Sequence, residues 1–427
     1  MKKHLSMPGM QSSLRNAFNK VADPKTKAGI SLTDCLSSGL AVFSLKYPSL
    51  LQYDRERMSY CNNLKSLFQI GVAPSDTYLR ERLDDVDPRD LRRCFTKLFS
   101  MVQRGNYLEG YVHHEGRYLV SIDGTGYFSS KNIHCDQCCI KNHRDGTTTY
   151  YHQVLAAALI HPDLKQVVPF APEPISKQDG TNKNDCERNA AKRLLSDLRR
   201  EHPHLSLTVV EDALYANAPH LELLKTLDMR YIIGVKPKDH TWLFDYVEHA
   251  GCDTHSLLDA QGYLHEFRFV NDAPLNESRE DVRVNFLEYV EISPKGTKKH
   301  FTWVTDFKLT IKTVYNIMRG GRARWKIENE TFNTLKNQGY QFEHNFGHGY
   351  KNLSHVFANL MLLAFFVDQI QAMACPSFKA ALKKQKSLTS LWRRIIAIFQ
   401  GFLIESWESL YDGIANWQGP VVKFNTS

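Results

Sequence analysis

The stretch Tyr118-Leu119-Val120-Ser121-Ile122-Asp123-Gly124-Thr125-Gly126 decides which fold the sequence predicts. Its apolar residues predict a strand that ends at Asp123, and the glycines that follow predict a loop. A second apolar run, residues 205–210, leads in the same way into Glu211 and Asp212. Sheets with packed helices place their sites at the carboxyl ends of strands, so both aspartates are candidate site residues.

The elements around these two strands alternate between strand and helix. Their order predicts an α/β fold, a mixed sheet with flanking helices. Apolar and aromatic runs predict strands at 150–160, 166–170 and 231–235, and helical periodicity predicts helices at 185–200 and 218–227. Short β-like runs at 266–270, 284–292 and 301–304 predict a β-rich insertion, and later helices are expected at 316–336, 354–373 and 387–407.

Five regions follow from these patterns. Residues 1–110 form a helical region, 111–237 the first part of the α/β core, 238–310 the β-rich insertion, 311–375 the helical second part of the core, and 376–427 a helical C-terminal region. The first region carries scattered basic residues, which make it a candidate for binding DNA. A solvated charged face on a helical bundle explains any single one of them equally well. They include Arg15, Lys20, Lys25, Lys27, Arg80, Arg82, Arg92 and Arg93.

Composition excludes several classes of protein. The 427 residues suffice for a large core, and lysine plus arginine exceed the acids by 54 to 46, which suits contact with phosphate backbones without requiring it. Nine scattered cysteines and the lack of an apolar leader favour a reducing cytoplasm. The longest apolar run, residues 356–367, is shorter than the roughly twenty residues of a membrane span, so we expect a core helix and no membrane partner.

Three motifs, in this order, resemble those of DDE transposases of the insertion-sequence 4 family, whose catalytic core is ribonuclease-H-like. Asp123-Gly124-Thr125 matches the Asp-Gly-Thr or Asp-Gly-Ser of the first acid. Asp212-Ala213-Leu214-Tyr215 matches the second, with an aromatic residue three positions on. The stretch from Arg324 to Glu328, followed by Lys336, matches a helix with Arg-x3-Glu and a later lysine. A β-rich insertion before the third acid is also a family feature.

The resemblance implies a function and a set of functional residues. Asp123, Asp212 and Glu328 are then the catalytic residues and the ligands of Mg²⁺, for which Mn²⁺ can substitute. Arg324 and Lys336 are expected to bind DNA phosphates, and Trp325 to stack on an unpaired base. The implied activity is strand cleavage at the ends of an insertion sequence and strand transfer into target DNA. The resemblance also implies that the helical region of residues 1–110 binds the DNA ends. The implied partners are double-stranded DNA, both terminal inverted repeats and target, and a second copy in a homodimer.

Alternatives remain at each level. An aspartate before glycine is often only a turn former, Arg324 and Lys336 could be solvated helix charges, and Trp325 could be a core residue. Gly321 stands where the family has a tyrosine, and Lys336 falls eight positions after Glu328 rather than seven. Glu330 competes as third acid but has no arginine four residues earlier. The alternative functions are those of a DNA nuclease without joining activity and of a catalytically silent DNA-binding regulator. We expect a bacterial-type cytoplasmic location, associated with the nucleoid when the protein is bound to DNA.

A cysteine and histidine cluster follows the first motif. Cys135 and Cys138 have the Cys-x2-Cys spacing of half a zinc site. Two further ligands would have to come from His134, Cys139, His143, His152 or Cys186. Because only half of a site is visible, we expect a loop with buried thiols in preference to structural Zn²⁺.

Overall fold

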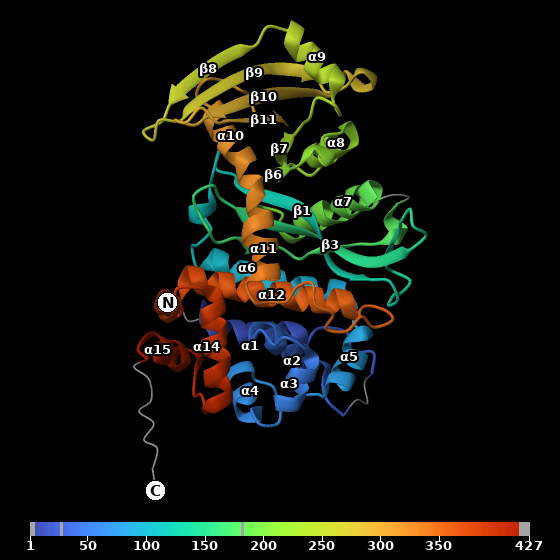
Figure 1. The fold of residues 1–427 in the computed structure, drawn as a ribbon, viewed down its shortest axis with the longest axis vertical. Helices are drawn as coiled ribbons and strands as arrows, with labels where there is room; N and C mark the ends of the chain where they lie inside the picture. The colour runs from blue at the N-terminus through green and yellow to red at the C-terminus, as the bar shows by residue number, and fades with distance from the viewer. Residues whose placement is uncertain (1–4, 26–28, 181–182, 418–427) are drawn as a thin grey trace. The chain divides into compact units, whose positions relative to one another are not determined.

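The computed structural model describes residues 5–25, 29–180 and 183–417, so Lys27 lies outside the described residues. The chain forms two compact units (Figure 1). The sheet unit consists of residues 107–332, and the helical unit combines residues 1–106 with residues 333–427. The helical unit is therefore built from two segments that are far apart in the sequence.

The described part of the sheet unit holds one mixed sheet. Its strands follow the order β2-β3-β1-β6-β7-β11-β10-β9-β8, with β4 and β5 paired to β3. Strand β1 is antiparallel to β3 and parallel to β6, and β6 is parallel to β7. The strands are β1 (Tyr118–Ser130), β2 (Cys139–Asn142), β3 (Thr148–Ile160), β4 (Val168–Pro169), β5 (Glu173–Ile175), β6 (Leu207–Glu211), β7 (Arg230–Gly234), β8 (Asp253–Leu258), β9 (Leu264–Pro274), β10 (Arg283–Ile292) and β11 (Lys298–Thr305).

Helices flank this sheet, as an α/β fold requires. Strand β6 is buried along its whole length, which is typical of a parallel strand covered on both faces. Helix α7 (Lys183–Glu201) packs on β3 and β5, α8 (Ala218–Thr226) on β7, and α10 (Val314–Arg322) on β6, β7 and β10. The remaining helix is α9 (Thr241–His249), which packs on β9. The predicted α/β class, a ribonuclease-H-like mixed sheet with flanking helices, is confirmed.

The β-rich segment continues this sheet. Strand β11 pairs with β7 through Trp303 and Gly234, and β10, β9 and β8 follow outward as antiparallel neighbours. Stacked aromatic rings line one face of this part: Phe301 lies parallel to Trp303, with ring centroids 5.6 Å apart. The insertion therefore extends the edge of the central sheet.

Strand β1 does not end at Asp123, where the sequence predicts its end. It continues to Ser130, because Gly124 and Gly126 pair with Leu155 and Gln153 of β3. The predicted loop of residues 124–126 is therefore part of the ladder. What does end near Asp123 is the parallel pairing with β6, whose last paired residue on β1 is Ser121.

The helical unit surrounds one apolar helix, α12 (Leu353–Ala374). By length and composition α12 could cross a membrane, but 78% of its most apolar window is buried. It packs on α2, α5 and α6 from the first segment of the unit. The other helices are α1 (Met7–Phe18), α2 (Leu32–Ser44), α3 (Leu50–Glu56), α4 (Cys61–Phe68), α5 (Asp76–Asp84), α6 (Arg92–Arg104), α11 (Asn333–Asn337), α13 (Pro376–Gln385), α14 (Leu388–Gly401) and α15 (Trp407–Ala415).

The predicted helix at 387–407 is two helices. Helix α14 ends at Gly401, and Ser406 caps the start of α15. Between them the chain is held by Asn63, whose side-chain amide donates to the carbonyl of Phe402 and whose oxygen accepts from the N–H of Ile404. A tertiary contact from a distant helix therefore interrupts a helical pattern.

Gly321 marks the tightest approach between α10 and the sheet. A Cβ at this position would lie 2.6 Å from Cε2 and Nε1 of Trp303, closer than side-chain atoms can approach. The indole of Trp303 thus fills the space that a larger residue at 321 would need. This explains why the chain carries glycine where the family it resembles has tyrosine.

Replacing Gly321 with Ala should destabilise the sheet unit. Overpacking lowers the free energy of unfolding by about 1–3 kcal/mol. The better helix propensity of alanine restores at most about 1 kcal/mol of this loss. Urea unfolding followed by circular dichroism measures the change. Gly413→Ala is the control, because a Cβ there meets no atom within 4 Å and should leave stability equal or higher. Equal stability of the Gly321→Ala variant and the wild type would contradict this packing argument.

Candidate active site

The parallel pairing of β1 with β6 sets the positions of the first two acids. Ser121 pairs with Val210, so two more residues along each strand bring Asp123 and Asp212 beside each other. Asp212 is the first residue after β6, and its carboxylate accepts a hydrogen bond of 2.9 Å from the N–H of Leu214. This cap holds an exposed carboxylate at the carboxyl end of β6.

The predicted third acid, Glu328, comes from a distorted helix that lies on β1 and β3. After α10 the chain forms a 3₁₀ turn, Ala323–Trp325, and then a π-helical segment, Ile327–Phe332. Ile327 and Phe332 pack on Ala156, the cross-strand partner of Asp123. Buried contacts on one side of the segment therefore hold Glu328 close to Asp123. Such π segments are frequent at functional sites.

Arg324 joins two of the acids. Its guanidinium contacts Asp123 Oδ2 at 3.2 Å and Glu328 Oε1 at 2.6 Å. Ser121 fixes the backbone at this point, because its hydroxyl donates to the carbonyl oxygen of Arg324 at 3.1 Å. One turn of helix separates Arg324 from Glu328, so the Arg-x3-Glu spacing places both on one face.

The pKa of Asp123 reflects its burial and the charged groups around it. The pKa of Asp123 is raised from 3.8 to about 7, and burial is the largest cause. The negative charges of Glu328 and Asp212 also raise this pKa, whereas Arg324 and the N–H of Gly124 lower it. Burial would lower the pKa of Arg324, but Glu328, Asp123 and Asp212 together raise it. All three predicted acids therefore act on Arg324, and two of them act on Asp123.

The geometry distinguishes Glu328 from its competitor Glu330. Glu328 contacts Arg324, whereas Glu330 acts on Lys326, whose ammonium donates to the carbonyl of Leu164 at 2.7 Å. Burial lowers the pKa of Lys326, and the charge of Glu330 opposes that effect. The arrangement favours Glu328 as the third member of the acidic group.

Glu187 is a further carboxylate at this site, and the sequence analysis did not single it out. It lies on α7, where its Oε1 accepts a hydrogen bond of 3.0 Å from the hydroxyl of Tyr215. A Cβ at Gly124 would lie 3.1 Å from Glu187 Oε2, so the glycine after Asp123 leaves room for this carboxylate. In the sequence, Glu187 is one polar residue on an amphipathic helix. Many surface residues have the same pattern, so it does not identify Glu187 as a site residue.

The predicted DNA-binding residues belong to both units, two to the sheet unit and one to the helical unit. Arg324 lies among the acids. Lys336 lies on α11 in the helical unit, where it pairs with Glu343 at 2.8 Å. The site of the sheet unit is therefore built without Lys336. Trp325 is 43% exposed, so it is not the core residue that a tryptophan usually is.

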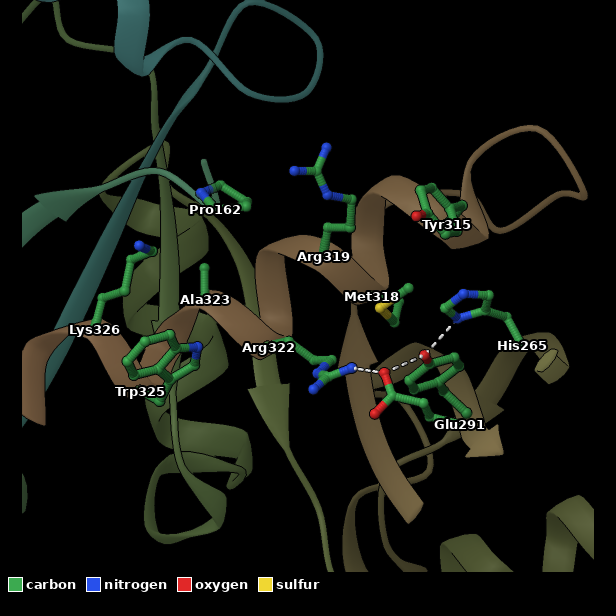
Figure 2. A pocket seen from close by; sticks show the side chains of 11 residues that line it. Pro162, His265, Glu291, Tyr315, Met318, Arg319, Arg322, Ala323, Trp325 and Lys326 are labelled. Atoms are coloured by element: carbon green, nitrogen blue, oxygen red, sulfur yellow. Dashed lines mark hydrogen bonds and ion pairs between the residues drawn. The ribbon is translucent and has the colours of Figure 1, made fainter. Parts of the chain in front are cut away.

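Trp325 lines a pocket of about 290 Å³ in the sheet unit (Figure 2). Three basic side chains also line it: Arg319 and Arg322 from α10, and Lys326 just after the 3₁₀ turn. Arg322 pairs with Glu291, and Arg319 pairs with Asp163. These ion pairs balance much of the positive charge, and Trp325 supplies an exposed aromatic surface beside it.

Basic residues of the helical unit are also paired. Lys27 is not described, but Arg15 contacts Asp34, Lys25 contacts Asp85, Arg80 contacts Asp76, and Arg82 contacts Asp23. Arg82 is 2% exposed, so it serves the interior of this unit. For these four side chains the structure favours a role in packing and surface charge balance over contact with DNA.

A family model described as a transposase DDE domain matches residues 135–366, slightly more than half of the chain. The matched span includes Asp212, Arg324 and Glu328, and it begins after Asp123. No curated protein matches the chain.

In the absence of metal, Asp123→Asn should be more stable than the wild type at pH 8 and similar to it near pH 4. The pKa of Asp123 is raised in the folded state, so the unfolded chain releases this proton at a lower pH than the folded protein does. The free energy of unfolding of the wild type therefore falls as pH rises from 3.8 to about 7. We expect a gain of at least about 1.4 kcal/mol at pH 8, the equivalent of one pKa unit. Urea unfolding in the presence of EDTA measures it.

Asp145→Asn is the control for this experiment. The N–H and hydroxyl of Thr147 lower the pKa of Asp145, so its charge favours the folded state above the ordinary pKa. This replacement should give no gain at pH 8. A stability difference between wild type and Asp123→Asn that does not change between pH 4 and pH 8 would contradict the assigned burial.

Proposed function

Because the chain belongs to the transposase DDE domain family, we propose that it is a DNA transposase that cuts the ends of an insertion sequence and joins them to target DNA. The observation that carries the proposal is the convergence of Asp123, Asp212 and Glu328 around Arg324 in the sheet unit. Membership of the insertion-sequence 4 family, supported by the spacing of Arg324 and Glu328, is part of the proposal.

The donor set fits divalent metal ions. Three carboxylates offer hard oxygen ligands of the kind that Mg²⁺ and Mn²⁺ prefer. Three acids surround one arginine, and a bound cation would neutralise the negative charge that Arg324 leaves unbalanced. Asp123, Asp212 and Glu328 would hold the ions. When bound, two such ions activate the attacking oxygen and neutralise charge at phosphorus.

The residues of the chain supply position and charge for this reaction. Both proposed steps are in-line displacements at phosphorus: water cuts a strand, and the freed 3′-hydroxyl then attacks target DNA. Arg324 lies close enough to the acids to bind a phosphate adjacent to the reacting one. Trp325, exposed beside a pocket, offers a surface on which an unpaired base can stack.

Joining two ends requires that both be held at once, so the proposal includes a homodimer on DNA. The substrates are the terminal inverted repeats and a target duplex. A strand-transfer assay with precut ends separates this function from that of a nuclease without joining activity. Metal-dependent cutting separates it from that of a silent DNA-binding regulator.

Asp123→Asn, Asp212→Asn and Glu328→Gln should each reduce strand cleavage by at least about 10³-fold, since each removes a ligand charge at nearly equal volume. Glu330→Gln is the matched control and should stay within about tenfold of wild type. The assay uses DNA that flanks the gene, with Mg²⁺ or Mn²⁺. An inactive Glu330→Gln protein beside an active Glu328→Gln protein would move the third acid to Glu330.

Arg324→Ala should weaken binding to end DNA and reduce the slope of log affinity against log salt by about one unit, because one fewer counterion is released. Gel-shift titrations over a range of salt concentrations measure this slope. Arg279→Ala is the control, an exposed arginine paired with Glu222 and Asp281, and should leave the slope unchanged. We expect a smaller effect for Lys336→Ala. An unchanged slope for Arg324→Ala would rule out the phosphate contact.

A further inference from the structure

The turn between β1 and β2 brings two cysteines and a histidine together within the sheet unit. Cys135 and Cys138 Sγ lie 3.9 Å apart, and His152 Nε2 lies 3.5 Å from the first and 3.4 Å from the second. Cys138 and His152 are each 1% exposed. The separation of the sulfurs is too long for a disulfide, and all three ligand atoms face one point.

These distances match the edges of a zinc coordination tetrahedron. With Zn–S near 2.3 Å and Zn–N near 2.0–2.1 Å, tetrahedral angles place two sulfur ligands about 3.8 Å apart and a sulfur and a nitrogen about 3.6 Å apart. The three observed separations each lie close to these values. Soft thiolates with an imidazole select Zn²⁺ over the Mg²⁺ that carboxylates prefer.

The neighbouring candidate ligands are turned toward other partners. The thiol of Cys139 donates to the carbonyl of Ile175, His143 contacts the hydroxyl of Thr149 at 2.8 Å, and the ring of His134 packs on Tyr150. The thiol of Cys186 donates to the carbonyl of Gly180. Among the residues that the sequence left open, the fold thus selects His152.

The surroundings also resemble those of a structural metal site. The ring of Tyr127 stacks on His152, and Phe128, the cross-strand partner of His152, packs beside it. The N–H of Cys135 donates to Cys138 Sγ at 3.5 Å. Aromatic cover and a backbone donor to sulfur hold the ligands in place around a metal.

We propose that Cys135, Cys138 and His152 bind one structural Zn²⁺ that fastens the turn before β2 to strand β3. The fourth position of the tetrahedron falls to water or to a further donor. The site is separate from the carboxylates, because His152 precedes Ala156, the partner of Asp123, by four residues on the same strand. Zinc here stabilises the β1–β3 ribbon that carries Asp123 and takes no part in phosphoryl transfer.

The full chain, expressed with zinc in the medium and purified in reductant without a metal-affinity tag, should contain about one Zn²⁺ per chain by elemental analysis. The zinc content per chain should fall about tenfold or more in each of the variants Cys135→Ser, Cys138→Ser and His152→Asn. Cys139→Ser and His143→Asn are matched controls that should keep it, as should Asp123→Asn. Loss of zinc from Asp123→Asn, or equal loss from the controls, would overturn the assignment.

A second measurement covers variants that fail to fold. Wild-type protein stripped with a chelator and titrated with Co²⁺ should develop the visible bands of a tetrahedral ion and a thiolate charge-transfer band, and Zn²⁺ should abolish both. Its melting temperature should rise when Zn²⁺ is restored. Wild-type protein that contains no zinc, gives no such spectrum with Co²⁺, or holds Cys135 and Cys138 as a disulfide under reductant would overturn the proposal.

Discussion

The burial of Asp123 beside two other acids is the constraint on which the site of the sheet unit depends. Glu328 and Asp212 act on Asp123 at the end of the parallel pairing between β1 and β6, and burial makes the charge on Asp123 costly. Arg324 offsets this cost by contacting two of the three acids. The rest of the unit holds these groups together despite their repulsion: a parallel ladder fixes two, and a packed π-helical segment fixes the third.

This arrangement depends on small residues at two close approaches. Gly321 lets α10 lie against Trp303, which sets the path of the helix that continues to Glu328. Gly124 leaves space for the carboxylate of Glu187 beside Asp123. The Asp-Gly of the first motif is therefore more than a turn former here, since the glycine lies within a strand and admits another acidic side chain.

Local patterns predicted most of the elements, because period-two and helical periodicity are properties of short stretches. The acidic group was predicted from the resemblance of three motifs to those of DDE transposases. They failed where a distant segment decides the outcome. The glycines after Asp123 indicated a loop, yet pairing with β3 keeps residues 124–130 in the strand. Asn63 ends a helix more than 330 residues later in the chain. Glu187 and His152 gained their partners only through folding, which spacing in the sequence does not reveal.

The discontinuous helical unit has a consequence for synthesis on the ribosome. Helices α2, α5 and α6 bury apolar side chains against α12, yet 226 residues of the sheet unit are translated between the two segments. At bacterial or eukaryotic elongation rates of about 5–20 residues per second, the earlier helices wait roughly 10–45 s for that partner. During this interval their exposed apolar surface is a binding site for chaperones and a source of aggregation, and the sheet unit can complete its own core first.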